Sequence, residues 1–157
     1  MKSKARAVVI GGGVVGVSTL YHLAAKGWDD SILLERKSLT SGSTWHAAGL
    51  LPLFNMSYSV GQIHKYSVRF YQELQDETGM DVGFRKVSNI RLASTQDRMD
   101  EYLQYKGVAD TIGVEVNVLS PQEIKDCWPL VSTENLIGAI QHPEDGYIKP
   151  ADLTQAF

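Results

Sequence analysis

The residues best suited to chemistry in this sequence are three glycines near its beginning. The apolar run 7–10 leads directly into Gly11, Gly13 and Gly16, which have the spacing G-x-G-x-x-G. Glycines at this spacing allow a tight turn, a close approach of the backbone to a pyrophosphate, and a helix lying close to the strand. The amides at the helix start then face the phosphates, with the positive end of the helix dipole behind them.

An acidic residue at the end of the next apolar run is the second candidate. Glu35 follows Ile32-Leu33-Leu34, about twenty residues after the glycines, where a βαβ unit places the acid that binds ribose hydroxyls. Its charge would repel a phosphate, which favours FAD or NAD over NADP. Arg36 lies over the adenine or faces solvent, and the sequence leaves both open.

The segment 38–52 is rich in small and hydroxylic residues and contains the pair Trp45-His46. Such a segment can bring backbone amides and hydroxyl groups close to a ligand, because few side chains keep the ligand away. The same composition also suits a loop followed by a helix capped by Ser43 or Thr44. Composition alone does not separate the two interpretations.

Hydrophobic periodicity predicts the elements that must position these residues. Residues 5–35 form a βαβ unit, with a helix from about Val14 to Lys26 that Gly27 ends. Beyond it the pattern predicts helices at 61–79, 94–112, 120–127 and from 152 onward, and strands at 82–93, 114–119 and 136–141. The buried face of the helix 61–79 is expected to consist of Ile63, Tyr66, Phe70 and Leu74.

Three shorter signals predict local structure. Ser120 and Glu123 form a capping box. Asp145-Gly146 predicts the turn of a hairpin. Asp152 is expected to cap the helix that follows it.

Composition limits the class of protein. The chain has 157 residues, 43% of them hydrophobic and 21% charged, and a net charge of −3. With no long Lys/Arg run and no apolar stretch of membrane-spanning length, neither nucleic acid nor a membrane is an expected partner. The basic start passes into the first strand without a signal or transit pattern, which predicts a cytoplasmic protein. Cys127 is the only cysteine, so no internal disulfide forms.

The sequence resembles the N-terminal part of the D-amino-acid-oxidase-like FAD-dependent oxidoreductases, and within them the dimethylglycine and sarcosine dehydrogenase/oxidase group. The likeness is carried by 9–16, 33–36 and above all 41–50, and continues at Gly83, 88–93 and 145–150. It implies an FAD held covalently through its 8α-methyl group by His46. The implied cofactor-binding residues are Gly11, Gly13, Val14, Val15, Gly16, Glu35, Arg36, Gly42, Ser43, Thr44, Trp45, His46, Ala47, Ala48, Gly49 and Leu50.

The resemblance also implies an activity. Enzymes of this group oxidise N-methyl amino acids such as dimethylglycine or sarcosine by hydride transfer to the flavin, and the iminium product is hydrolysed or captured by folate. Folate and an electron acceptor are therefore expected partners of the parent enzyme. No catalytic residue or metal ligand is assigned within residues 1–157.

The expected fold is α/β, with a Rossmann-like FAD-binding βαβ unit followed by part of an α+β substrate domain. Residues 1–60 belong to the FAD-binding domain, 61–150 to the substrate domain, and 151–157 begin a return to the first. A doubly wound sheet needs more parallel strands than residues 1–50 supply. We therefore expect a truncated N-terminal fragment, inactive by itself.

Three other interpretations remain open. A NAD-dependent dehydrogenase would explain the βαβ unit but gives no role to 41–50. A non-catalytic regulatory relative of the same family would have no need of His46. A truncated fragment with an incomplete sheet would bind no cofactor.

Overall fold

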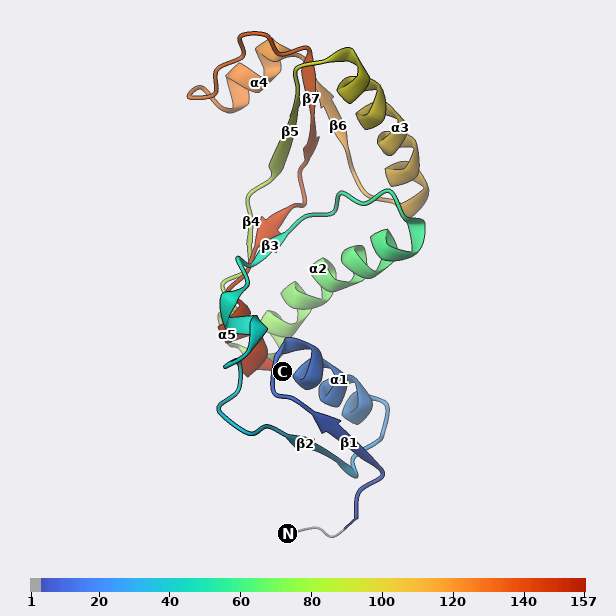
Figure 1. Cartoon of the computed structure of the whole chain (residues 1–157), viewed down its shortest axis with the longest axis vertical. Helices are drawn as coiled ribbons and strands as arrows, with labels where there is room; N and C mark the ends of the chain where they lie inside the picture. Colours follow the sequence, from blue (N-terminus) through green and yellow to red (C-terminus); the bar gives the residue numbers. More distant parts are fainter. Residues whose placement is uncertain (1–3) are drawn as a thin grey trace. The chain divides into compact units, whose positions relative to one another are not determined.

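The computed structural model describes residues 4–157, and the chain divides into two compact units. Its elements are labelled in Figure 1. Unit 1 comprises Met1–Gly49, Tyr71–Phe84 and Ile148–Phe157, and unit 2 comprises Leu50–Phe70 and Arg85–Tyr147. The expected limits were residues 60 and 150. The units instead change at Leu50 and at Ile148, and the segment 71–84 groups with unit 1.

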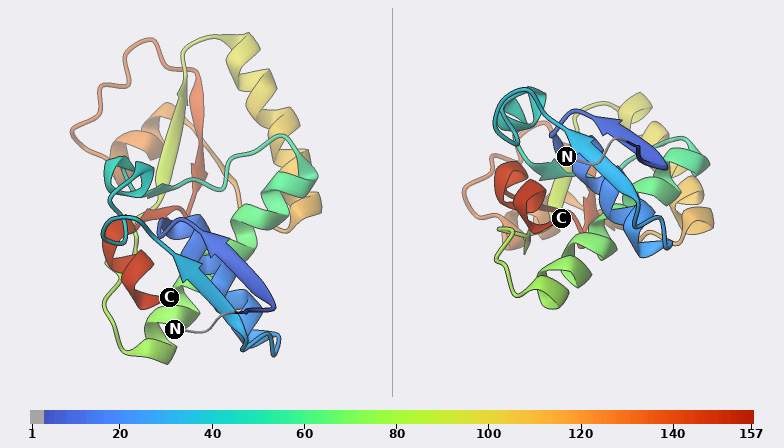
Figure 2. Two further views of the ribbon diagram at one scale, coloured as in Figure 1. Left: turned by 60° about the horizontal axis from the view of Figure 1, so that its bottom comes forward. Right: turned by 90° about the horizontal axis from the view of Figure 1, so that it is seen from below.

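Unit 1 contains the predicted βαβ unit. The strands β1 (Ala7–Ile10) and β2 (Ser31–Leu34) are parallel neighbours, and α1 (Val14–Ala25) connects them. Figure 2 shows the two strands side by side with α1 behind them. Gly27 has a φ of 79° and ends the helix in the left-handed conformation, as predicted. The α/β class is therefore confirmed at its first element.

The strands of unit 1 are covered on one face only. Val17 of α1 is buried, whereas exposure reaches 53% at Val8, 86% at Ile10 and 54% at Leu34. The helix α5 (Pro150–Ala156) contacts α1, and the rings of Tyr21 and Phe157 lie 5.6 Å apart. The other face of the β1–β2 sheet carries Val8, Ile10 and Leu34 and is therefore exposed and apolar.

The start of α5 corrects one prediction. Pro150 occupies the first helical turn and Lys149 the cap position. Asp152 therefore lies inside the first turn, where it faces the positive end of the helix dipole, and does not cap the helix.

Unit 2 is built on an antiparallel sheet of order β5-β7-β6. Its strands are β5 (Asn89–Ala93), β6 (Asn117–Leu119) and β7 (Gly138–His142). The helix α3 (Gln96–Ile112) is capped by the side chain of Thr95 and contributes buried residues to the core. That core consists of Leu53, Ala93, Met99, Tyr102, Tyr105, Ala109, Ile112, Val114, Val116 and Ile140.

A second, smaller sheet of unit 2 overturns the hairpin prediction. It has the order β3-β8-β4, from β3 (Leu50–Leu51), β4 (Arg85–Lys86) and β8 (Gly146–Tyr147). The chain turns at Pro143-Glu144 and leaves the sheet that contains β7, because β8 pairs with β3 and β4 instead. By contrast, the capping box of Ser120 and Glu123 forms as predicted at the start of α4 (Pro121–Cys127).

The helix α2 (Tyr58–Thr78) buries a different face from the predicted one. Leu74 is fully buried, but Ile63 is 63% and Tyr66 56% exposed. Within unit 2 the helix instead presents Gly61, where an added Cβ would overlap the side chain of Ile112. Glycine at position 61 lets α2 lie close to Ile112, and the spacing of apolar residues in the sequence does not indicate this contact. No helix among residues 4–157 has the length and apolarity needed to cross a membrane.

Candidate cofactor-binding site

Two positions of the glycine turn of unit 1 require glycine, one for its backbone conformation and one for lack of space. Gly11 has a φ of 109° and donates its amide hydrogen to the carbonyl oxygen of Leu34 at 2.8 Å. A Cβ at Gly16 would overlap the carbonyl oxygen of Gly11. The turn and the close packing of α1 on the strand therefore both require glycine, as the spacing predicted.

Glu35 fixes the same turn from the end of β2. Its Oε2 accepts the amide hydrogen of Gly12 at 2.7 Å, and its Oε1 that of Lys37 at 2.8 Å. These two bonds, led by that from Gly12, hold the pKa of Glu35 below its usual value, so the side chain is anionic at neutral pH. Each oxygen keeps a second lone pair, which can accept a hydrogen bond from a ribose hydroxyl.

Gly12 is a site residue that the sequence analysis did not single out. A Cβ at this position would lie 2.6 Å from Cδ2 of Leu39 and 3.0 Å from Cβ of Glu35. The signal was available in the unbroken Gly11-Gly12-Gly13 run, because only two of these glycines are explained by the nucleotide motif.

Thr44 brings the segment 38–52 onto the glycine turn. The side chain is buried, and its Oγ1 accepts the amide hydrogen of Val14 at 3.0 Å. A Cβ at Gly13 would lie 2.9 Å from the same oxygen. The amide of Thr40 also donates to the carbonyl oxygen of Gly12 at 2.9 Å. The two motifs therefore form one structure at the start of α1.

The predicted local cap at Ser43 or Thr44 is wrong. Residues Ser43–His46 form a short 3₁₀ helix, η1, preceded by Gly42, and no side chain caps it. Thr44 instead caps α1, a helix that begins 30 residues earlier.

Trp45 and His46 both lie at the surface of unit 1. Trp45 is 70% exposed, so it does not pack in the interior. The imidazole Nδ1 of His46 lies 3.1 Å from the carbonyl oxygen of Gly42. Because a carbonyl only accepts, Nδ1 carries the proton in this bond, and Nε2 of the neutral ring carries the lone pair.

Most of the remaining predicted site residues are exposed. Val15 is 77% exposed at the start of α1, and Arg36, Ala47 and Ala48 are exposed as well. Gly49 has a φ of 75°, and its carbonyl oxygen accepts the amide hydrogen of Ile148 at 2.8 Å. Leu50 belongs to β3 and is 68% exposed.

These features suit the adenosine diphosphate part of a dinucleotide. The turn keeps Cβ atoms away, the first amides of a helix lack partners within it, and Glu35 supplies an anionic acceptor nearby. Thr44 occupies one of these amides, which leaves the rest of the first turn for phosphate oxygens.

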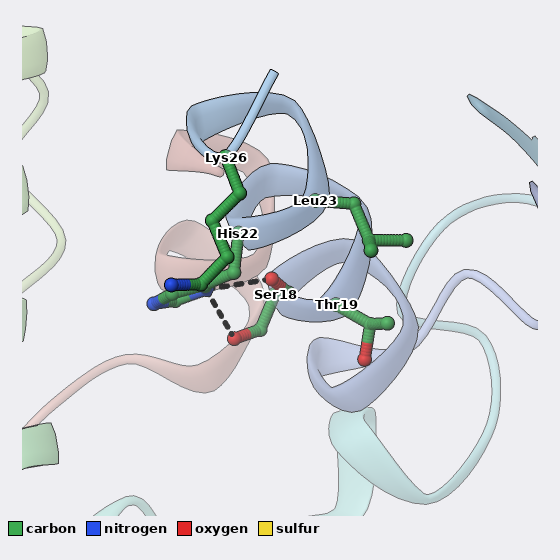
Figure 3. Close-up of a pocket in the computed structure, with 5 residues that line it drawn as sticks. All are labelled: Ser18, Thr19, His22, Leu23 and Lys26. Carbon is green, nitrogen blue, oxygen red and sulfur yellow. Dashed lines mark hydrogen bonds between the residues drawn. The ribbon is translucent and has the colours of Figure 1, made fainter. Parts of the chain in front are cut away.

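A separate concavity of about 350 Å³ lies on α1 and is lined by Ser18, Thr19, His22, Leu23 and Lys26 (Figure 3). The polar groups of Ser18, Thr19 and His22 are hydrogen-bonded within the helix. His22 Nδ1 lies 2.7 Å from the carbonyl oxygen of Ser18, and the Thr19 hydroxyl donates to that of Val15 at 2.7 Å. We assign no ligand to it.

A family model described as FAD dependent oxidoreductase (DAO) matches residues 6–157. This chain belongs to that family. Among solved structures, the DAO fold is matched by L-proline dehydrogenase from P. horikoshii with a TM-score of 0.90 and 25% identity, over 99% of this chain and 41% of the other. The FAD-dependent class and the α/β fold expected from the sequence are thereby confirmed.

Three curated proteins are similar to this chain over nearly its whole length. Mitochondrial dimethylglycine dehydrogenase of Rattus norvegicus is 41% identical over 99% of this chain and 18% of its own length. Mitochondrial sarcosine dehydrogenase of Homo sapiens is 41% identical, over 96% and 17%. The mitochondrial pyruvate dehydrogenase phosphatase regulatory subunit of Mus musculus is 34% identical, over 100% and 18%. The chain thus spans less than one fifth of these relatives.

Proposed function

We propose that this protein belongs to an FAD-dependent enzyme that oxidises N-methyl amino acids of the dimethylglycine or sarcosine type. The single observation that carries the proposal is the junction of the segment 40–46 with the glycine turn through Thr44 and Val14. It joins a dinucleotide motif to the Trp-His motif of the resembled group. Dehydrogenases for dimethylglycine and sarcosine are among the relatives at 41% identity.

Each part of the site has a distinct role in this proposal. The glycine turn and the start of α1 bind the diphosphate, and Glu35 binds the adenosine ribose. When bound, FAD supplies the acceptor for a hydride from the substrate N-methyl carbon. Folate and a separate electron acceptor are the further partners that we propose for the parent enzyme.

His46 is the residue that we propose holds the flavin covalently through the 8α-methyl group. The hydrogen bond from Nδ1 to Gly42 leaves Nε2 as the nucleophilic atom of the ring. The exposure of His46 leaves this atom accessible. We therefore expect the bond to form at Nε2.

The test is acid denaturation of the protein expressed from its complete reading frame. Yellow colour and flavin fluorescence should remain with the wild-type polypeptide and with His64→Ala, but leave His46→Ala. His64 is the matched control because its Nδ1 also faces a backbone carbonyl, that of Pro52 at 3.1 Å. Flavin that washes out of the denatured wild type would refute the covalent bond.

The same preparation tests the substrate class. Dimethylglycine or sarcosine should bleach the flavin absorbance in the absence of an acceptor. A second candidate, a non-catalytic regulatory role, is favoured by the 34% identity to a phosphatase regulatory subunit. A protein without flavin, or with flavin that no amine bleaches, would support that role instead.

A further inference from the structure

Unit 2 contains a group of polar side chains, three of them buried and Arg91 half-buried, that the proposed chemistry does not use. Arg91, Tyr105, His142 and Asp145 surround or adjoin the ring of Phe54. His142 is fully buried and Asp145 is 2% exposed. The guanidinium carbon of Arg91 lies 4.2 Å from the centre of the Phe54 ring, and the His142 ring centre lies 6.2 Å from it.

Part of the hydrogen-bonding capacity of this cluster is satisfied. Tyr105 donates its hydroxyl hydrogen to the carbonyl oxygen of Leu53 at 3.3 Å, and His142 Nε2 lies 3.0 Å from the same hydroxyl. Because the hydroxyl hydrogen is used, Nε2 is the donor, and Nδ1 of the neutral ring is an acceptor. Asp145 Oδ1 accepts the amide hydrogen of Leu53 at 2.8 Å.

Three atoms of the cluster remain without a partner: Arg91 Nε, His142 Nδ1 and Asp145 Oδ2. Buried polar atoms in native proteins are almost always hydrogen-bonded, to protein or to ordered water. The three atoms comprise one donor and two acceptors. A water molecule, with two hydrogens to donate and lone pairs to accept, has the complementary set.

Two groups of the cluster have shifted pKa values, although its opposite charges are not paired. Within residues 4–157, Arg91 and Asp145 form no ion pair. Burial lowers the pKa of His142 to about 4, and the positive charge of Arg91 acts in the same direction. Burial raises the pKa of Asp145 to about 6, against the Leu53 amide and the charge of Arg91. Arg91 pairs with Ile140 in the β5–β7 ladder, so it is the diagonal neighbour of His142 on the same face of the sheet.

We propose that Arg91, His142 and Asp145 enclose a buried water molecule. It donates hydrogen bonds to His142 Nδ1 and Asp145 Oδ2 and accepts one from Arg91 Nε. Through this water, β5 and β7 are joined to the corner that precedes β8. The site lies entirely in unit 2 and does not depend on a bound cofactor.

A crystal structure of the full-length wild-type protein at about 1.8 Å or better tests the proposal. We expect a solvent peak at about 2.6–3.2 Å from at least two of the three atoms. No peak in this position, or a direct bond between Arg91 and Asp145, would overturn it.

Two variants sharpen this test. Asp145→Leu removes one acceptor and fills the space, so the peak should disappear. Glu144→Gln changes the exposed neighbouring carboxylate, and the peak should persist. Water retained at the same place in Asp145→Leu would contradict the assignment. If that variant does not fold, the wild-type density decides alone.

Discussion

Thr44 joins two motifs that are separated by 30 residues in the sequence. Its hydroxyl accepts the amide hydrogen of Val14, while Gly13 lies close enough that a Cβ would be 2.9 Å from the same oxygen. A single buried side chain thus holds the predicted flavin segment against the predicted phosphate turn. Both the stability of unit 1 and its affinity for a dinucleotide should depend on this contact.

Thr44→Val tests this contact with little change in shape. The loss of the hydroxyl leaves the Val14 amide without its acceptor, so the free energy of unfolding should fall by about 1 kcal/mol. Chemical denaturation measures the change. Thr19→Val is the matched control, because the exposed Thr19 bonds only to its own helix, and it should change stability by less than about 0.5 kcal/mol. Equal effects of the two substitutions would count against the cap.

Two glycine-to-alanine substitutions should have opposite signs. Gly16→Ala places a Cβ against the backbone oxygen of Gly11, which cannot rotate away, so we expect a loss of at least about 2 kcal/mol and weaker FAD retention. Gly107→Ala lies in α3, where nothing is within 4 Å of the new Cβ, and should stabilise the protein by about 0.5–1 kcal/mol. Thermal unfolding compares them, and a neutral Gly16→Ala would refute the close approach.

At the scale of elements, the sequence predicts best where the signal is local. The spacing of Gly11, Gly16 and Gly27, and the capping box at Ser120, depend on residues within a few positions of one another. Their structures follow from backbone conformation and hydrogen bonding in one turn. These elements lie where the pattern placed them.

The failures involve contacts between distant segments. The buried face of α2 depends on Ile112, which accepts hydrogen bonds from Lys65 Nζ at 3.0 Å and Gln62 Nε2 at 3.3 Å. The hydrophobic periodicity of residues 58–78 does not indicate this contact with Ile112. Likewise the chain turns at Pro143-Glu144 rather than at Asp145-Gly146, and the strand partners of β8 lie 60 or more residues away. The hydrogen bond from the Val14 amide to Thr44 also joins distant segments, so the local sequence did not predict it.

The corner between β7 and β8 should show two opposing pH dependences. The pKa of Asp145 is raised to about 6, so its contribution to stability is present at low pH and is lost as pH rises from about 4 to about 6. The pKa of His142 is lowered to about 4, so its contribution is present above about 6.5 and is lost as pH falls towards 4. Each amounts to about 3 kcal/mol, and they largely cancel.

Asp145→Asn separates the two effects. The variant keeps an acceptor for the Leu53 amide but retains only the His142 dependence. Relative to it, the wild type should gain about 3 kcal/mol of stability as pH falls from about 6 to about 4. Denaturant titrations at several pH values measure this difference. Glu144→Gln should parallel the wild type, and a difference between wild type and Asp145→Asn that does not change with pH would disprove the pKa shift.

At the scale of the molecule, the most exposed apolar strand surface belongs to unit 1. Ile10 is 86% exposed beside Val8 and Leu34, so the three residues form one patch on adjacent strands. Contiguous apolar patches of this kind bind apolar partners or dyes more than isolated residues do. The 157-residue chain should therefore enhance the fluorescence of anilinonaphthalene sulfonate.

Ile10→Ser should lower that fluorescence clearly. Leu130→Ser provides the comparison, because Leu130 is 100% exposed but is separate from this patch. Leu130→Ser should leave the dye fluorescence nearly unchanged. Equal decreases would mean that total apolar exposure, rather than the patch on β1 and β2, binds the dye.

The pairing of β3 with β8 has a consequence for synthesis on the ribosome. The strands β1 and β2 can pair once about 35 residues have emerged, because they are joined by a short crossover. Leu50 must wait for Tyr147, which at bacterial or eukaryotic elongation rates takes a further 5–20 seconds or so. During that interval the strand that follows His46 has an unpaired edge. We expect nascent chains halted before residue 146 to bind chaperones at the unpaired strand β3. The glycine turn of unit 1 should already have formed in these chains.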